Sequence, residues 1–147
     1  MDKKRGFSLI ELMSVIAIIA VLSAIALPLY TKSKCKAHTG EVPSCLSDVA
    51  LRMENYRSNH GHYPITAGAI PPDLNLTTAN CGEYYIIQVW ANNTEYYIEA
   101  TDTQKKLPCS SVAGDDEWVL TNTSPKLLHT KNAINPGKVD PTPAKPG

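Results

Sequence analysis

The residues that could perform chemistry in this 147-residue sequence are few and scattered. The four histidines are His38, His60, His62 and His129. His60 and His62 flank Gly61 and could offer two imidazoles to a metal, but no third ligand follows at a suitable spacing. The acidic run Asp115-Asp116-Glu117 lacks the spaced oxygen ligands of a calcium loop. We therefore expect no metal site and no cofactor.

No motif indicates catalysis. The sequence has no glycine-rich phosphate loop, no G-x-S-x-G segment, and no nucleophile with an identifiable base. We expect no catalytic residue and no enzymatic activity. The 14 basic and 14 acidic side chains balance, and three of the basic ones fall within residues 1–6. A nucleic-acid-binding domain would need a basic stripe, so the sequence does not favour nucleic acid as a partner.

The four cysteines point to disulfide chemistry. They are Cys35, Cys45, Cys81 and Cys109, and none belongs to a C-x-x-C pair. An even number of cysteines beyond a membrane-crossing segment favours disulfides in an oxidising compartment. Four cysteines allow three pairings, and sequence alone does not choose among them. We prefer Cys35–Cys45 and Cys81–Cys109, because neighbours close the smaller loops; unpaired buried thiols are the alternative.

Glu11 is the most informative single residue, because it is the only charged side chain between Phe7 and Tyr30. A helix over residues 7–30 would rise about 36 Å, enough to cross a hydrocarbon core of about 30 Å. The cations of residues 3–5 precede this helix and would keep the N-terminus cytoplasmic. A carboxylate at the centre of such a helix costs about 2.5–3.5 kcal/mol on insertion scales, which indicates a function and a partner for it.

Two ordinary membrane segments compete with a functional one. A secretory signal would use Ala24-Ile25-Ala26 as its cleavage site, so the mature chain would start at Leu27. A plain signal anchor would keep the whole segment. Neither explains Glu11, unless its carboxylate simply extends to the lipid headgroups.

The segment Lys-Lys-Arg-Gly6 followed by Phe7-Ser-Leu-Ile-Glu11-Leu resembles the prepilin peptidase recognition site of type IV pilins and type II secretion pseudopilins. The resemblance extends over about 24 residues, with Ser8 where threonine is commoner and Pro28 where pilins often carry a helix-kinking proline. It implies that a membrane peptidase cleaves between Gly6 and Phe7 and N-methylates Phe7. The chain would then be the substrate of that peptidase.

Cleavage would leave a free α-amine at Phe7, which is largely cationic at neutral pH. We expect Glu11 to pair with this amine on a neighbouring subunit, because a misplaced subunit would leave a buried charge alone. Pro28 lacks an N–H and clashes with the preceding turn, which predicts a kink or a locally melted stretch over residues 24–28.

Beyond residue 30 the sequence predicts a small α+β head. The helix continues as a polar extension until Gly40 and Pro43 interrupt it, and a second, amphipathic helix begins after Ser44. This break departs from the resembled family, whose long helix usually runs unbroken into the head. A straight helix would hold Cys35 and Cys45 about 15 Å apart, so that disulfide and a continuous helix exclude each other.

The amphipathic helix should pack on an antiparallel sheet of three to four strands. Strands are expected at residues 84–90, 95–101 and 118–121, separated by loops over 65–82 and 102–116. The segment from Met53 to Pro64 resembles the end of the pilin helix and supports a minor or PilE-like pilin. After residue 122 proline, lysine, asparagine and glycine predict a flexible tail.

The expected organisation is a leader over residues 1–6, a transmembrane and assembly helix over 7–30, a head over 31–122 and a tail over 123–147. The resemblance implies a structural subunit of a type IV pilus, more a minor than a major pilin, which serves assembly, adhesion, twitching motility or DNA uptake. Its partners would be other pilin subunits, the prepilin peptidase and the inner-membrane assembly platform. It would start in the bacterial inner membrane and end in the extracellular filament. The alternative is a pseudopilin of a type II secretion system.

Overall fold

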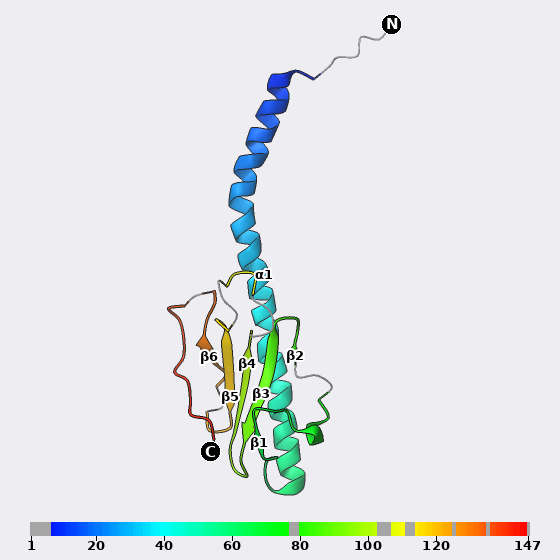
Figure 1. Cartoon of the computed structure of the whole chain (residues 1–147), viewed down its shortest axis with the longest axis vertical. Helices are drawn as coiled ribbons and strands as arrows, with labels where there is room; N and C mark the ends of the chain where they lie inside the picture. Colours follow the sequence, from blue (N-terminus) through cyan, green and yellow to red (C-terminus); the bar gives the residue numbers. More distant parts are fainter. Residues whose placement is uncertain are drawn as a thin grey trace.

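The computed structural model describes residues 7–76, 80–102, 107–110, 114–124, 126–134 and 136–146. The expected leader, with Gly6, lies outside the described residues, as do parts of both expected loops. Figure 1 shows one long helix that projects from a head in which the same helix packs on an antiparallel sheet. The predicted α+β class, with an apolar N-terminal helix, is confirmed.

The helix α1 runs without a break from Leu9 to His60. The predicted interruption at Gly40 and Pro43 and the separate second helix are therefore wrong, since both residues lie inside α1. A proline inside a helix removes one backbone hydrogen bond. Here that loss is outweighed by packing, because Val42 and Leu46 on either side of Pro43 are fully buried against the sheet. The helix ends at Gly61, which has the left-handed conformation and lies within the segment from Met53 to Pro64 that was predicted to be the helix end.

The exposed half of α1 is also continuous through Pro28. No locally melted stretch occurs there, so this part of the prediction is wrong for the separate chain. Thr31 Oγ1 donates a hydrogen bond of 3.0 Å to the Pro28 carbonyl, and the helix curves gently along its length (Figure 1). The strongly helix-forming alanine and leucine residues around Pro28 let the helix absorb the proline by bending.

Six strands form one antiparallel sheet in the described residues. They are β1 (Thr66–Ala67), β2 (Asn80–Cys81), β3 (Tyr85–Ala91), β4 (Tyr96–Thr101), β5 (Glu117–Thr121) and β6 (Leu128–Lys131). The order is β1-β3-β4-β5-β6, and β2 also pairs with β3. The three long strands β3, β4 and β5 lie within one residue of their predicted bounds, whereas the two-residue strands and β6 were not predicted.

The core lies between α1 and the inner face of the sheet. Val89 of β3 and Ile98 of β4 are fully buried there, in one core cluster with Val49 and Met53 of the helix. Burial alternates along β3, as expected for a strand with one face on the core. In contrast, all six residues of β4 are buried, which requires a cover on the outer face as well.

Part of that cover comes from the stretch predicted as a flexible tail, residues 123–147, and the tail boundary is therefore corrected. Strand β6 belongs to the sheet, and the Asp140 N–H donates a hydrogen bond of 2.9 Å to the His129 carbonyl. Lys145 reaches back to Glu99 on the outer face of β4. Local composition did not reveal β6, because four residues with one large apolar side chain carry almost no strand pattern.

The disulfides are Cys35–Cys109 and Cys45–Cys81, with Cα atoms 5.8 and 5.9 Å apart. The preferred pairing of neighbours was wrong. The physical reason is the continuity of α1, which holds Cys35 and Cys45 on one rod and sends each to a different part of the sheet. Cys35 reaches the loop after β4, and Cys45 reaches β2.

Both disulfides should contribute to stability, and the one that closes the larger loop should contribute more. The bond Cys35–Cys109 spans 74 residues and Cys45–Cys81 spans 36. Replacing either pair by alanines should cost about 2–5 kcal/mol, with the loss about 0.6 kcal/mol larger for Cys35 and Cys109. Urea unfolding of the detergent-solubilised full chain, followed by tryptophan fluorescence, measures both losses. A pair whose removal leaves the unfolding free energy unchanged would show that its bond does not form.

Candidate functional site

The exposed half of α1 is the first candidate site. Every residue from Phe7 to Lys34 is exposed in the separate chain. An 18-residue window of α1 has a mean hydropathy of 2.6 and none of it is buried, so by length and composition this helix could cross a membrane. A bare apolar surface of this size requires lipid or other helices to cover it.

Glu11 lies in the first turn of this helix. Its Oε2 accepts a hydrogen bond of 2.9 Å from the Ser8 N–H, so the carboxylate caps the helix to which it belongs. Phe7, the predicted methylated residue, precedes the cap and is 85% exposed. The fold thus brings Phe7 and Glu11 to the same end of α1. The capping role was missed, although the spacing S-x-x-E from Ser8 to Glu11 is its sequence signal.

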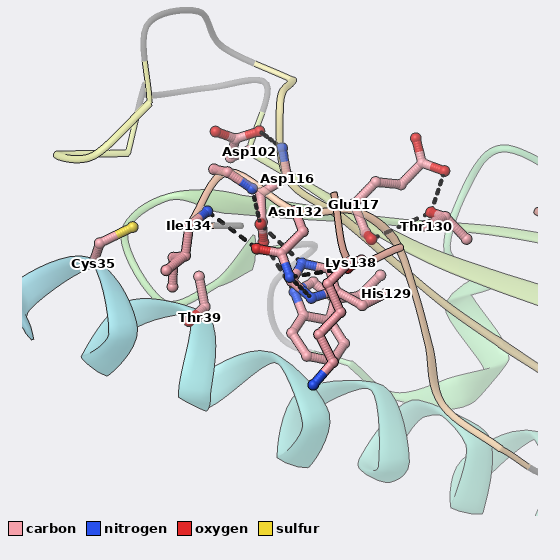
Figure 2. A network of polar contacts seen from close by, with 12 residues as sticks. Cys35, Thr39, Asp102, Asp116, Glu117, His129, Thr130, Asn132, Ile134 and Lys138 are labelled. Atoms are coloured by element: carbon pink, nitrogen blue, oxygen red, sulfur yellow. Dashed lines mark hydrogen bonds and ion pairs between the residues drawn. The ribbon is translucent and has the colours of Figure 1, made fainter. Parts of the chain in front are cut away.

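The second candidate is a buried polar network in the head (Figure 2), centred on Asp116. The Asp116 side chain is fully buried and accepts four hydrogen bonds. Tyr85 Oη (2.5 Å) and Trp118 Nε1 (2.9 Å) donate to Oδ2, while His129 Nε2 (2.9 Å) and the Ala133 N–H (2.9 Å) meet Oδ1. The partners come from β3, β5, β6 and the segment after β6, so one carboxylate joins four parts of the head.

The network sets the charge states of its members. Burial alone would raise the pKa of the Asp116 carboxyl, but the hydrogen bonds from His129, Tyr85 and Ala133 outweigh burial and hold that pKa below its usual range. Burial, strengthened by the bond to Asp116, raises the pKa of Tyr85 far above its ordinary value. Asp116 is therefore ionised and Tyr85 neutral near pH 7.

The fold gives the three acidic side chains of residues 115–117 different partners, so they do not converge on one site. Asp116 points into the head, Ser110 Oγ donates to Asp115 at 2.9 Å, and Glu117 meets Lys131 Nζ at 2.7 Å. His60 stacks on Tyr56 at the end of α1, with ring centroids 4.1 Å apart. Among the residues that the structure describes, no group of three or more His, Cys, Asp or Glu side chains could hold a metal ion.

A surface cleft of about 450 Å³ adjoins the Cys35–Cys109 disulfide. Its lining residues are Cys109, Ser110, Asp115, Thr130, Lys131, Asn132, Ala133, Pro136 and Val139. The lining is mixed polar and apolar and offers hydrogen bonds, and its Ser110 hydroxyl donates to the Asp115 carboxylate. Such a surface suits binding to a partner.

Four lysines follow β5 in the sequence, and three of them form ion pairs with carboxylates. Lys131 Nζ lies 2.7 Å from Glu117, Lys145 Nζ lies 2.9 Å from Glu99, and Lys126 Nζ lies 3.3 Å from Asp140. In the described part of the chain, each of these three lysines is therefore paired with a carboxylate.

Comparison with known proteins gives two family matches. Residues 28–113 match the family described as "Type IV minor pilin ComP, DNA uptake sequence receptor", and residues 1–27 match the "Prokaryotic N-terminal methylation motif". The second match extends over the predicted cleavage site, Glu11 and most of the apolar segment. Together the two matches confirm the resemblance to type IV pilins.

Individual relatives agree with these families. The chain is 38% identical over 76 residues to the type IV major pilin protein PilE1 of Neisseria gonorrhoeae, which is 50% of this chain and 46% of that protein. It is 47% identical over 64 residues to the fimbrial protein EcpB of Eikenella corrodens (44% and 40%), and 37% identical over 65 residues to the type II secretion system core protein G of Escherichia coli (44% and 45%). The chain thus spans less than half the length of these relatives. No solved structure matches it.

Removal of the Asp116 charge should destabilise the head in a pH-dependent way. Asp116→Asn should cost about 3 kcal/mol at pH 7, because four donors lose an ionised acceptor. Since folding lowers the pKa of Asp116, this stabilisation is present above about pH 4, the unfolded value, and is lost as the pH falls through the folded pKa. Urea unfolding of the full chain at pH 7 and pH 3 measures the difference between variant and wild type.

The matched control is Asp73→Asn, which changes an exposed aspartate in the short helix η1 (Pro72–Leu74). It should alter the unfolding free energy by less than about 0.5 kcal/mol. An Asp116→Asn loss as small as that of the control, or a loss equal at both pH values, would contradict the role given to this carboxylate.

Proposed function

The chain belongs to the type IV minor pilin family, and from this premise we propose that it is a minor subunit of a bacterial type IV pilus, polymerised through the exposed half of α1. It is a structural protein and not an enzyme. The observation that supports polymerisation most directly is an apolar helix surface, bare from Phe7 to Lys34, that carries one carboxylate, Glu11.

The pathway begins with a single-pass precursor in the inner membrane. The methylation motif over residues 1–27 supports cleavage between Gly6 and Phe7 and methylation of Phe7 by the prepilin peptidase. The assembly platform then transfers α1 from lipid to the helices of other pilin subunits, and the head reaches the outside of the cell as part of the filament.

Glu11 would fix the axial position of the incoming helix relative to its neighbours in the filament. Movement of an apolar helix from lipid into a helix bundle gains little hydrophobic free energy, so association depends on close packing and polar pairs. In the separate chain the Glu11 carboxylate accepts the Ser8 N–H, a neutral donor. The methylated Phe7 amine of a neighbouring subunit offers a cation instead, and a charged donor makes the stronger hydrogen bond.

A pseudopilin of a type II secretion system is the alternative, and the similarity to core protein G keeps it open. The minor-pilin family match includes most of the head, from residue 28 to 113, and favours the pilus. Adhesion, twitching motility and DNA uptake are the processes in which such a subunit would serve.

Loss of the Glu11 charge should block incorporation into fibres. Glu11→Gln retains an oxygen for the Ser8 N–H and removes the charge, so it should lower the amount of this chain in sheared fibres at least about tenfold, at equal membrane levels. Immunoblots of fibre and membrane fractions measure the ratio. The N-terminal mass in each fraction should show methylated Phe7, which separates an assembly defect from a processing defect.

The matched control is Glu95→Gln, which removes a charge from the exposed turn between β3 and β4. It should enter fibres at the wild-type level. Normal incorporation of Glu11→Gln would refute the proposed pairing, and a mature chain that starts at Leu27 would refute the pilin itself.

A second candidate function is binding of double-stranded DNA, favoured by the family description as a DNA uptake sequence receptor. The paired lysines Lys126, Lys131 and Lys145 argue against a mode that depends mainly on phosphate charge. We therefore expect contacts to base edges or groove shape to supply most of the preference for one sequence.

Mobility-shift titration of the detergent-solubilised full chain tests this. Duplexes from the genome of the source organism should bind at least about tenfold more tightly than unrelated duplexes of equal length. The dependence of affinity on salt should be shallow, equivalent to few released counterions. Absence of a shift at low salt would reject DNA as a ligand of the separate chain and leave the role in the pilus unaffected.

A further inference from the structure

The outer face of the sheet carries an aromatic and acidic cage that the roles above do not use. Trp90 of β3 and Tyr97 of β4 are cross-strand partners, and their rings meet edge to face with centroids 5.8 Å apart. Glu99 lies two residues beyond Tyr97 on the same face of β4. All three side chains belong to regular strands, so the sheet builds the cage independently of what fills it.

An ammonium group fills the cage. Lys145 Nζ lies 3.4 Å from the centroid of the Trp90 ring, 5.2 Å from that of Tyr97 and 2.9 Å from Glu99 Oε2. Aromatic faces attract cations through their quadrupole, and the attraction is stronger where water is excluded. The Glu99 side chain is only 11% exposed and requires a cation, since a buried carboxylate without a partner is costly.

A short tether, residues 141–144, connects Lys145 to Asp140, which is fixed on β6. Asp140 fixes the chain to β6, because its N–H donates to the His129 carbonyl and its Oδ2 accepts the His129 N–H at 3.2 Å. Of the described residues 141–146, Lys145 is the one that forms an ion pair and ring contacts with the sheet. Pro141, Pro143 and Pro146 keep this stretch extended. Lys145 can therefore leave the cage while Asp140 stays in place.

We propose that Trp90, Tyr97 and Glu99 form a binding site for the side chain of a lysine within an extended, proline-flanked peptide, and that Lys145 is its internal ligand. A lysine presented by another protein would displace Lys145 and dock that protein on the outer face of the sheet. The tether gives Lys145 an effective concentration in the millimolar range, so a competing segment must bring further contacts or be present at high density.

The cage also sits within a wider balance of charge on this face. Glu117 lies on β5, where burial alone would raise the pKa of its carboxyl, but the hydrogen bonds from Lys131 and Thr130, with a smaller contribution from the charge of Lys145, hold that pKa below its usual range. Departure of Lys145 without a replacement would leave Glu99 without its cation. Exchange for another lysine keeps the balance, which makes a lysine a better competitor than a neutral or acidic side chain.

Fluorine NMR of the full chain in detergent, labelled with 5-fluorotryptophan, tests the proposal directly. The chain has two tryptophans, so Trp90 reports on the cage and Trp118, on the inner face, reports on the fold. Lys145→Met keeps an unbranched side chain that is shorter only by the terminal ammonium position, and it removes the charge. It should shift the Trp90 resonance and leave that of Trp118 unchanged, and the matched Lys138→Met should shift neither.

The probe is a capped peptide with the sequence of residues 141–147. Added to the Lys145→Met chain, it should return the Trp90 resonance saturably, with half-saturation in the millimolar range. The wild-type chain should need at least about twofold more peptide, because tethered Lys145 competes at a millimolar effective concentration. Glu99→Gln in the Lys145→Met background should weaken binding at least tenfold. A peptide with norleucine in place of lysine should not bind.

Three results would overturn the proposal. One is an unchanged Trp90 resonance in Lys145→Met, because Lys145 would then not occupy the cage in solution. The second is equal binding of the lysine and norleucine peptides. The third is absence of saturable binding to the Lys145→Met chain, which would make Lys145 a fixed anchor of its own segment and not the occupant of an exchangeable site.

Discussion

The continuity of α1 is the constraint on which the rest of the structure depends. One rod serves two environments: its first half is apolar on all sides and bare, and its second half buries a single stripe against the sheet. The stripe consists of Cys35, Thr39, Val42, Leu46, Val49 and Met53, spaced by three or four residues as one face of a helix requires. Because no joint separates the halves, the position of the apolar half fixes the position of the head.

The two disulfides follow from this geometry. Cys35 lies at the start of the buried stripe and Cys45 lies next to Leu46, so both face the sheet and cannot reach each other. Each instead joins the rod to a loop or short strand that has little regular structure of its own. A small head buries limited apolar surface, and cross-links to the rod compensate for this.

The sequence predicted what depends on local pattern. The apolar segment and the strands β3 to β5 have a strong apolar or strand pattern, and the structure agrees with them, whereas the role of Glu11 in assembly stays a prediction. The predicted helix break at Gly40 and Pro43 was wrong because it considered only the local helix-breaking tendency of these residues. Burial of Val42 and Leu46 against the sheet is a tertiary effect that outweighs this tendency. The argument that a continuous helix forbids Cys35–Cys45 was sound, but sequence could not establish the continuity.

Non-local contacts were out of reach for the same reason. Asp116 meets Tyr85 across 31 residues, and Cys35 meets Cys109 across 74. Strand β6 exists because β5 offers it an edge, and its four residues carry no pattern that would reveal this. The Glu11 cap was the exception, since the spacing from Ser8 was visible and its meaning was overlooked.

The carboxylates of the chain show why Glu11 stands apart. Among the described residues, four acidic side chains of the head are nearly inaccessible. Asp116 accepts four hydrogen bonds, Glu117 pairs with Lys131, and Glu99 pairs with Lys145, whereas Asp102 Oδ1 accepts the backbone N–H groups of Gly114 and Asp116. Glu11, exposed in the separate chain, meets one neutral N–H. Once lipid or neighbouring helices cover α1, that single donor does not compensate a desolvated charge. In the proposed pairing the compensating cation is the methylated Phe7 amine of a neighbouring subunit, so assembly with a processed neighbour would be the state in which this carboxylate is compensated.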